Sequence, residues 1–365
     1  MPETQIHREI ELHGSIPFAR FMELALYCPD FGYYETKKDI GKHGDFYTSV
    51  SVGNLFGELL AFQLAAWLEE ARSAGCQPRI VESGAHDGTL AKDILTWLQS
   101  CQPKLFEQIE YVIIEPSARR QQWQKQTLKD FPNAVWVSDL ENLKSKIKNS
   151  KLSGVIFGNE LLDAFPVHRF GWNAQEKKWF EWNVAIQNKK FVWKKTIQPP
   201  THGLLRDSIP GLPPELLDVL PDNYTIEASP AAANWWRDAA ELLSRGKLLA
   251  LDYGYTVEEQ FSPARLNGTL RAYCSHRVTD DVLANPGEQD LTAHVNFSAI
   301  QKTGKNAGLK TEFFSTQTKF LTQILQRAVA EKSFGWNASR ARQFQTLTHP
   351  DHLGRAFRVL LQSRE

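Results

Sequence analysis

The feature that most constrains this chain is a short apolar strand that ends on a carboxylate and turns through glycines into a helix. It occupies residues 79–90, where the apolar run that ends in Glu82 and Ser83 is followed by Gly84, Gly88 and then Thr89. Glycine at 84 and 88 permits a tight turn and lets a ligand approach the backbone closely. A helix that opens near Thr89 directs unpaired N–H groups at such a ligand. This arrangement predicts a nucleotide-type cofactor site.

The spacing of the glycines indicates which cofactor to expect. Dinucleotide sites carry the fingerprint G-x-G-x-x-G, with a pyrophosphate on the helix N-terminus. Here the pattern is E-x-G-x-x-x-G from Glu82 to Gly88, and His86 stands where a central glycine is usual. The pattern fits the first motif of a class I methyltransferase better, so we expect S-adenosylmethionine.

A second apolar run ends in a carboxylate at Glu115, about one βαβ unit downstream of Glu82. An acid at this place can accept hydrogen bonds from both hydroxyls of a ribose. Taken alone, each acid is equally well explained as a polar residue at the end of a strand. Together they favour a cofactor site.

Charge and cysteine content exclude several classes of protein. Forty-two basic and forty-two acidic residues give a formal net charge of zero over 365 residues. We therefore expect no electrostatic footprint for nucleic acid or an anionic membrane. The four cysteines are far apart and include no C-x-x-C pair, so neither a disulfide framework nor a metal site is expected.

The N-terminal residues include several glutamates and no apolar core of the kind that secretory signals contain. The longest apolar run, residues 59–68, is interrupted by Gln63 and is too short to span a bilayer. We expect a cytoplasmic protein without membrane insertion.

From residue 79 onward, short apolar runs alternate with helical patterns, which is typical of a parallel α/β sheet. The expected strands are 79–83, 110–115, 134–137, 153–158, 247–252, 310–315 and 356–361, and the expected helices include 89–100, 117–128 and 231–243. The fold class predicted is α/β, with a Rossmann-like, seven-stranded, doubly wound sheet.

Two segments extend this core. Before it, a helix is expected from Ser15 as N-cap, with Pro17 in its first turn, to Tyr27, and another over residues 55–68. After the fourth strand, β-branched and aromatic residues at 167–172, 179–184 and 191–193 predict a β insertion. Its tryptophans are equally consistent with a wall of the substrate site and with a separate apolar core.

The predicted organisation has four parts. Residues 1–78 form a helical cap with a loop that covers the cofactor, 79–166 the first part of the core, 167–225 the insertion near the substrate, and 226–365 the second part of the core.

After the expected fourth strand come Asn159 and two acids three residues apart, Glu160 and Asp163. If that turn is helical, the two carboxylates share a face. Carboxylates hold a guanidinium through bidentate, charge-assisted hydrogen bonds, and they can localise its charge away from an attacking nitrogen. Structural or solvent-exposed acids are the alternative.

Two further polar segments are candidates for the site. The loop ahead of residue 55 contains Gly44, Asp45, Phe46, Thr48 and Ser49, which could cover the cofactor. Taken alone, these residues are equally consistent with a turn followed by a helix N-cap. Later in the chain, His294 is a candidate general base, although a hydrogen-bonded structural histidine is the commoner case.

With these pieces in place, the chain resembles the MidA-like family of S-adenosylmethionine-dependent methyltransferases, whose mitochondrial members are complex I assembly factors that methylate a protein arginine. The similar motifs span nearly the whole chain: 21–34, 44–49, 56–59, 159–167, 229–231, 252–255, 286–295 and Gly354. The resemblance implies a class I methyltransferase fold in which Glu82, Gly84, Gly88 and Glu115 meet the cofactor, with the 44–49 loop beside it.

The chain departs from the family pattern E-L-G-P-G-R-G-T-L at Ser83 and His86. A histidine with positive φ at this place would be strained, although histidine tolerates that region better than β-branched residues do. The function predicted is S-adenosylmethionine-dependent N-methylation of an arginine in a protein substrate. A small-molecule acceptor and a catalytically weak cofactor-binding scaffold remain alternatives, and a homodimer is left open.

Overall fold

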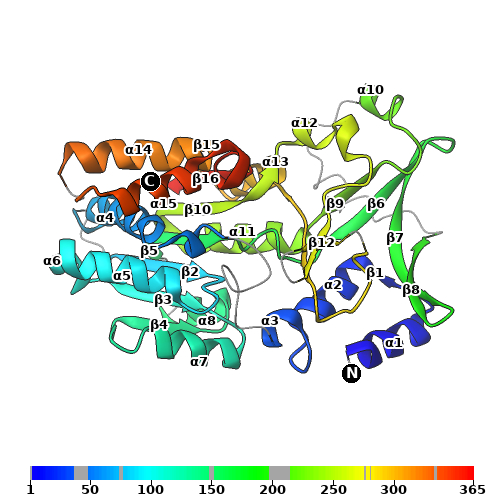
Figure 1. Ribbon diagram of the computed structural model, residues 1–365, viewed down its shortest axis with the longest axis horizontal. Helices are drawn as coiled ribbons and strands as arrows, with labels where there is room; N and C mark the ends of the chain where they lie inside the picture. Colours follow the sequence, from blue (N-terminus) through cyan, green and yellow to red (C-terminus); the bar gives the residue numbers. More distant parts are fainter. Residues whose placement is uncertain are drawn as a thin grey trace. The chain divides into compact units, whose positions relative to one another are not determined.

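The computed structural model describes residues 2–36, 48–73, 77–147, 152–196, 214–274, 277–279, 281–332 and 335–365. Two compact units can be distinguished (Figure 1). The first combines Met1–Phe46, Leu162–Trp235 and Gly254–Thr303, and the second combines Tyr47–Leu161, Trp236–Tyr253 and Gly304–Glu365. The predicted boundaries at 78, 166 and 225 stay predictions.

The second unit is built on a central sheet with the strand order β15-β16-β10-β5-β2-β3-β4. In chain order its strands are β2 (Arg79–Ser83), β3 (Glu110–Ile114), β4 (Ala134–Val137), β5 (Leu152–Asn159), β10 (Leu243–Tyr255), β15 (Lys310–Thr316) and β16 (Phe357–Arg364). The strands from β10 to β4 pair in parallel, and β16 is antiparallel to both of its neighbours. The expected seven-stranded doubly wound sheet is confirmed.

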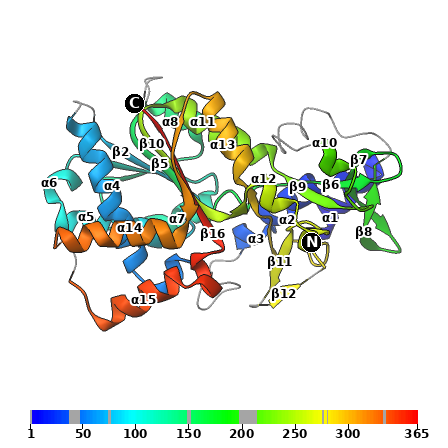
Figure 2. The same cartoon turned by 90° about the horizontal axis from the view of Figure 1, so that it is seen from above.

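Helices cover both faces of this sheet, as Figure 2 shows. On one face lie α4 (Leu55–Ser73), α5 (Thr89–Cys101) and α14 (Gln317–Ala330), and on the other lie α8 (Leu140–Lys146) and the later residues of α11 (Pro230–Leu242). Burial of an apolar stripe explains α5, because Leu90, Ile94 and Leu98 point into the core at period 3.6. The unit also contains α6 (Pro103–Phe106), α7 (Ala118–Thr127), α15 (Ala338–Thr348) and short turns at Val50–Val52 and Pro350–Gly354.

The chain order reverses between β2 and β5, which are neighbours in the sheet. In open α/β sheets, ligands bind outside the carboxyl ends of strands at such a reversal. The loops that follow Ser83 and Asn159 therefore form the expected site.

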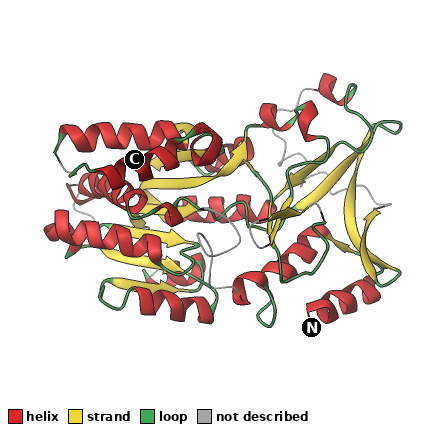
Figure 3. Cartoon of the chain, in the orientation of Figure 1, coloured by secondary structure: helices red, strands yellow, loops and turns green. Residues whose placement is uncertain are grey.

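The first unit contains two antiparallel sheets (Figure 3). One is formed by β1 (Ile16–Pro17), β7 (Lys178–Gln187), β6 (His168–Asn173) and β9 (Thr225–Ala228), with β8 (Lys190–Lys195) paired to β7, and the other by β12 (Arg277–Thr279), β11 (Arg271–Cys274) and β13 (Asp290–Thr292). A short strand β14 (Val295–Asn296) pairs with the end of β10. The expected β insertion after the fourth core strand is confirmed.

The helices of the first unit are α1 (Pro2–His13), α2 (Phe18–Tyr27), α3 (Tyr33–Thr36), α10 (Pro214–Leu217), α12 (Val257–Gln260), a turn at Pro263–Arg265 and most of α13 (Phe297–Asn306). Tryptophans of the insertion pack in the core of this unit. The ring centroid of Trp193 lies 5.1 Å from that of Phe18 in α2, and Trp172 is 2% exposed. At these two tryptophans, the interpretation as a separate apolar core is the one that the packing supports.

The predicted start of the first long helix is wrong. Ser15 is not its N-cap, because Ile16 and Pro17 form the edge strand β1 against Val184 and Asn183, and α2 begins at Phe18. Pro17 has φ −55° and ψ 147°, an extended conformation that proline readily adopts at a sheet edge.

Candidate cofactor and active site

The glycine turn after β2 carries three residues with positive φ: Gly84 at 77°, His86 at 46° and Gly88 at 86°. Gly88 is the N-cap residue of α5, and its carbonyl accepts the N–H of Lys92 at 2.9 Å. A Cβ added at Gly84 would lie 3.0 Å from Cδ1 of Leu161. The turn therefore needs glycine at both ends, and His86 does adopt the strained conformation that its place in the motif predicts.

Glu82 is the next-to-last residue of β2 and a buried carboxylate, 1% exposed. The hydroxyl of Tyr111 in β3 donates a hydrogen bond of 2.6 Å to its Oε2. Burial raises the pKa of Glu82 to about 7, with a further rise from Asp87, while the bond from Tyr111 lowers it. The sequence alone did not identify Tyr111 as part of this site.

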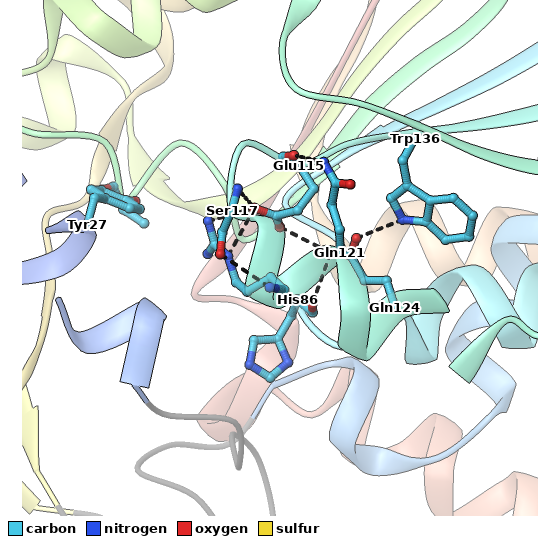
Figure 4. Close-up of polar contacts among 9 residues, drawn as sticks. Tyr27, His86, Glu115, Ser117, Gln121, Gln124 and Trp136 are labelled. Carbon is cyan, nitrogen blue, oxygen red and sulfur yellow. Dashed lines mark hydrogen bonds and ion pairs between the residues drawn. The ribbon is translucent and has the colours of Figure 1, made fainter. Parts of the chain in front are cut away.

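Glu115 follows β3 and is held on both oxygens (Figure 4). Its Oε1 accepts the backbone N–H of Ser117 at 2.9 Å and Nε of Arg120 at 3.0 Å, and its Oε2 accepts Nε2 of Gln124 at 3.0 Å. These contacts orient a carboxylate that is 1% exposed. Its predicted bonds to ribose hydroxyls stay a prediction.

Asp87 supports the start of α5, a role that the sequence analysis missed. Its Oδ1 accepts the backbone N–H of Thr89 at 2.9 Å and lies 3.8 Å from Nδ1 of His86. Although burial raises the pKa of Asp87, the His86 imidazole and the Thr89 N–H lower it to about 2. The sequence signal for this role is an aspartate two residues before the first helical residue, whose N–H has no partner within the helix.

Glu160 lies in the turn after β5 with φ 52°. Its backbone N–H donates to the carbonyl of Leu251 at 2.9 Å, and its Oε1 accepts Nδ2 of Asn159 at 3.2 Å and the N–H of Ser49 at 3.4 Å. The structure thus brings together three of the predicted site residues, Ser49, Asn159 and Glu160.

The turn after β5 is not helical, so the condition under which Glu160 and Asp163 would share a helix face is not met. The physical reason is the left-handed conformation of Glu160, which an α-helix does not accommodate. Its next residue, Leu161, is drawn toward β10 because its N–H donates to Oδ2 of the buried Asp252 at 3.1 Å.

Leu161 connects the Glu160 turn with the glycine turn. Its side chain lies against the backbone of Gly84 and Gly158, where an added Cβ would stand 3.0 Å and 2.7 Å from its δ-methyl carbons. Movement of Leu161 would therefore disturb both turns at once.

The loop residues predicted to cover the cofactor divide into two groups. Ser49 is buried, and its hydroxyl donates to Oε1 of Gln317 at 3.2 Å, while Thr48 exchanges hydrogen bonds with Ser51. Gly44, Asp45 and Phe46 lie outside the described residues.

Asp163 belongs to the first unit and is 6% exposed. Its backbone carbonyl accepts the N–H of Ala293 at 3.1 Å. Nearby, the hydroxyl of Tyr34 donates to Oδ1 of Asp290 at 2.7 Å, and burial, with smaller effects of Asp290 and Asp163, raises the pKa of Tyr34.

His294 also belongs to the first unit, where its ring stacks on Tyr255 at 4.5 Å. Cζ of Arg265 also lies over the Tyr255 ring, 3.8 Å from its centroid. Burial, together with Arg271 and Arg265, lowers the pKa of His294 to about 4. A histidine in this state is neutral at physiological pH and is a weak base, which favours a structural role.

The residues at the two turns fit a polar, nucleoside-containing cofactor. The glycine turn exposes backbone at the N-terminus of α5, and two buried carboxylates end the adjacent strands. Among the described residues, the buried Oγ of Ser83 and Oδ1 of Asn159 have no hydrogen-bond partner. Buried polar atoms of this kind are usually satisfied by a ligand or water.

Within the described part of the chain, no cluster of three or more histidine, cysteine, aspartate or glutamate side chains is placed to hold a metal ion. In the same residues, no helix is long and apolar enough to cross a membrane.

Comparison with known proteins identifies the family. The model of a family described as S-adenosyl-L-methionine-dependent methyltransferases matches residues 59–315, which is more than half of the chain. The chain belongs to this family. The expected fold and the expected cofactor, S-adenosyl-L-methionine, are thereby confirmed.

Individual relatives of this methyltransferase agree with the assignment. The mitochondrial protein arginine methyltransferase NDUFAF7 homolog of Drosophila melanogaster is 26% identical over 98% of this chain and 83% of its own length. The human mitochondrial protein arginine methyltransferase NDUFAF7 is 29% identical over 82% of this chain and 68% of its own length. Because both names specify mitochondria, they lend no support to the expected cytoplasmic location, which stays a prediction.

A solved structure resembles the methyltransferase over its whole length. It is a protein from Burkholderia thailandensis bound to S-adenosyl-homocysteine, with a TM-score of 0.84 and 29% sequence identity. The match covers 100% of this chain and 92% of that chain.

Proposed function

We propose that this methyltransferase transfers a methyl group to a guanidinium nitrogen of an arginine in a protein substrate. The observation that carries the proposal is the strained, half-buried turn of Glu160, which is tied through Leu161 to the glycine turn of the cofactor motif. Strain of this kind clusters at functional sites. The names of the curated relatives support arginine as the acceptor.

The cofactor supplies a methyl group on a sulfonium, and the protein must align the acceptor and steady its charge. In the proposed assignment, the Glu160 carboxylate binds the guanidinium through charge-assisted hydrogen bonds and concentrates its positive charge on the nitrogens that do not react. The side-chain amide of Asn159 and the backbone N–H of Ser49 orient this carboxylate by donating to its Oε1.

The remaining assignments are proposals of the same kind. Glu82, Gly84, His86, Gly88 and Glu115 would bind the cofactor, with Gly44, Asp45, Phe46, Thr48 and Ser49 beside it. Asp163, in the first unit, stays a predicted catalytic residue. His294, with its lowered pKa, would act as a stacking residue in place of the expected general base.

Two measurements on the full chain test the proposal. Calorimetric titration with S-adenosylmethionine and S-adenosylhomocysteine should show binding of both. If neither ligand binds at millimolar concentration, the proposed methyl transfer is refuted. Incubation of a lysate with methyl-labelled cofactor, followed by mass spectrometry, should then place label on arginine residues. Label found only in small molecules would reject the protein-arginine acceptor and favour the second candidate, a small-molecule methyltransferase.

A further inference from the structure

Gln124 joins three segments of the second unit through its side-chain amide (Figure 4). The residue is fully buried in α7. Its Nε2 donates to the carbonyl oxygen of His86 at 3.0 Å and to Oε2 of Glu115 at 3.0 Å, while its Oε1 accepts the indole N–H of Trp136 at 2.9 Å. The amide thus connects the glycine turn, the end of β3 and β4.

Trp136 determines which way this amide points. An indole nitrogen can only donate a hydrogen bond, so the group that faces it must be the amide oxygen. The two N–H groups of Gln124 are therefore left to face His86 and Glu115, which both offer acceptors. All donors and the acceptor of a buried amide are used in this way, which makes the group a rigid bridge.

The bridge acts on the one strained residue of the glycine turn. His86 has φ 46°, a region that non-glycine residues adopt only where their surroundings hold them. The bond from Gln124 to the His86 carbonyl is such a restraint. Gly88 lies against α7, since a Cβ there would be in van der Waals contact with Cα of Gln124 at 3.4 Å.

The same bridge acts on Glu115 from the side opposite to Arg120. Ser117 and Arg120 bind Oε1 of the carboxylate, and Gln124 binds Oε2. Removal of the Gln124 amide would take away this hydrogen bond to Oε2 and loosen the orientation of the carboxylate.

We propose that Gln124 is a positioning residue for cofactor binding: it holds His86 in its left-handed conformation and fixes the Glu115 carboxylate, so that both turns are ordered before the cofactor arrives. The inference rests on the proposed assignment of the glycine turn and Glu115 to the cofactor. Ordering a site in advance improves affinity because less conformational freedom is lost on binding.

The test compares Gln124→Met with Gln121→Met by calorimetric titration of the full chain with S-adenosylhomocysteine. Methionine keeps the approximate volume of glutamine and removes its hydrogen bonds. Gln121 is the control in the same helix: its Nε2 donates at 2.8 Å to the backbone carbonyl of Glu115, and it forms no hydrogen bond with the described residues of the glycine turn. We expect Gln124→Met to weaken binding by about 10-fold or more, equivalent to about 1.4 kcal/mol, and Gln121→Met by less than about 2-fold.

A double-mutant cycle with His86→Gly separates positioning from general stability. Glycine adopts positive φ without a restraint, so the effect of Gln124→Met on affinity should fall below about 3-fold in the His86→Gly background. The same loss in both backgrounds, or equal losses for Gln124→Met and Gln121→Met, would overturn the inference.

If Gln124→Met does not fold, Trp136→Phe decides the question, because it keeps Gln124 and an aromatic ring at position 136 while it removes the indole N–H that orients the amide. We expect a weaker but measurable loss of affinity, and none would overturn the inference. Failure of the wild-type chain to bind S-adenosylhomocysteine would instead refute the proposed function. Wild-type binding with unaffected variants would refute only the role of Gln124.

Discussion

The hydroxyl of Tyr111 donates a hydrogen bond of 2.6 Å to Oε2 of Glu82, and both side chains are buried. Burial raises the pKa of this carboxyl from 4.5 to about 7. Between these pH values the folded chain binds a proton that the unfolded chain has released. The free energy of unfolding therefore falls as the pH rises from about 4.5 to about 7.

Glu82→Gln should remove this dependence, because a carboxamide is neutral at every pH and its oxygen still accepts the bond from Tyr111. Relative to wild type, we expect the variant to be more stable at pH 8 by about 1 to 3 kcal/mol and nearly equal near pH 4.5. Denaturant unfolding at the two pH values, without cofactor, measures the difference. Glu110→Gln is the control, since Arg79 and Lys146 lower the pKa of Glu110 despite its partial burial. This variant should be less stable than wild type at pH 8, and the difference should shrink at low pH. The same stability difference at both pH values would contradict the prediction.

Glu160→Gln should reduce turnover by about 30-fold to 1000-fold, equivalent to about 2 to 4 kcal/mol of transition-state stabilisation. The carboxamide keeps the shape and still accepts hydrogen bonds from Asn159 and Ser49, but it loses the charge that holds a guanidinium. Affinity for S-adenosylhomocysteine and the melting temperature should change little. Glu312→Gln, which removes a carboxylate that pairs with Lys247 in the same sheet, controls for loss of one charge.

Turnover and thermal unfolding should be measured on the same Glu160→Gln preparation. Unchanged turnover with a lowered melting temperature would identify Glu160 as a structural acid, since loss of such a contact costs about 1 kcal/mol in stability alone.

His86→Gly should stabilise the chain by about 0.5 to 1 kcal/mol and raise the melting temperature, because glycine tolerates φ 46° without the penalty that a side chain imposes. His86→Ala keeps that penalty and loses the contact with Asp87, so it should bring no gain. Thermal unfolding of the two variants side by side separates strain from the side chain. Equal shifts would show that φ is not the cause.

His294 should remain neutral throughout the working range, because burial and two arginines lower its pKa to about 4. Since the unfolded chain binds the proton below about 6.5, this histidine makes the fold less stable as the pH falls from about 6.5 to about 4. The imidazole signals in an NMR titration should show no ionisation of His294 between pH 5.5 and 8.5. A midpoint near 6.5 would disprove the lowered pKa and reopen its role as a base.

The core strands could be predicted because strands buried on both faces of a parallel sheet are continuous apolar runs. The runs at Arg79–Ser83 and Ala134–Val137 have the bounds that the sequence predicts. The glycine turn was equally visible, since positive φ at Gly84 and Gly88 demands a residue type that can be recognised in the sequence.

Other features depended on partners far away in the chain. Pro17 was expected in a helix, and Val184 and Asn183 place it at the edge of a sheet. Glu160 was considered for a helical turn, and Asp252, 91 residues beyond Leu161, helps to set a different one. Nothing local to Gln124 or Tyr111 distinguishes them from other polar residues in a helix and a strand.

The sequence by itself determined the family of the chain, the order of its core elements and the segments that carry the candidate site, because apolar periodicity and glycine spacing are local properties. Only the tertiary structure decided which side chains meet at that site, how Glu115 and Glu160 are oriented, and which carboxyl has a raised pKa. These properties come from burial and from hydrogen bonds between segments that are distant in sequence, such as Tyr111 with Glu82 and Gln124 with His86. A pattern read along the chain does not contain those distances.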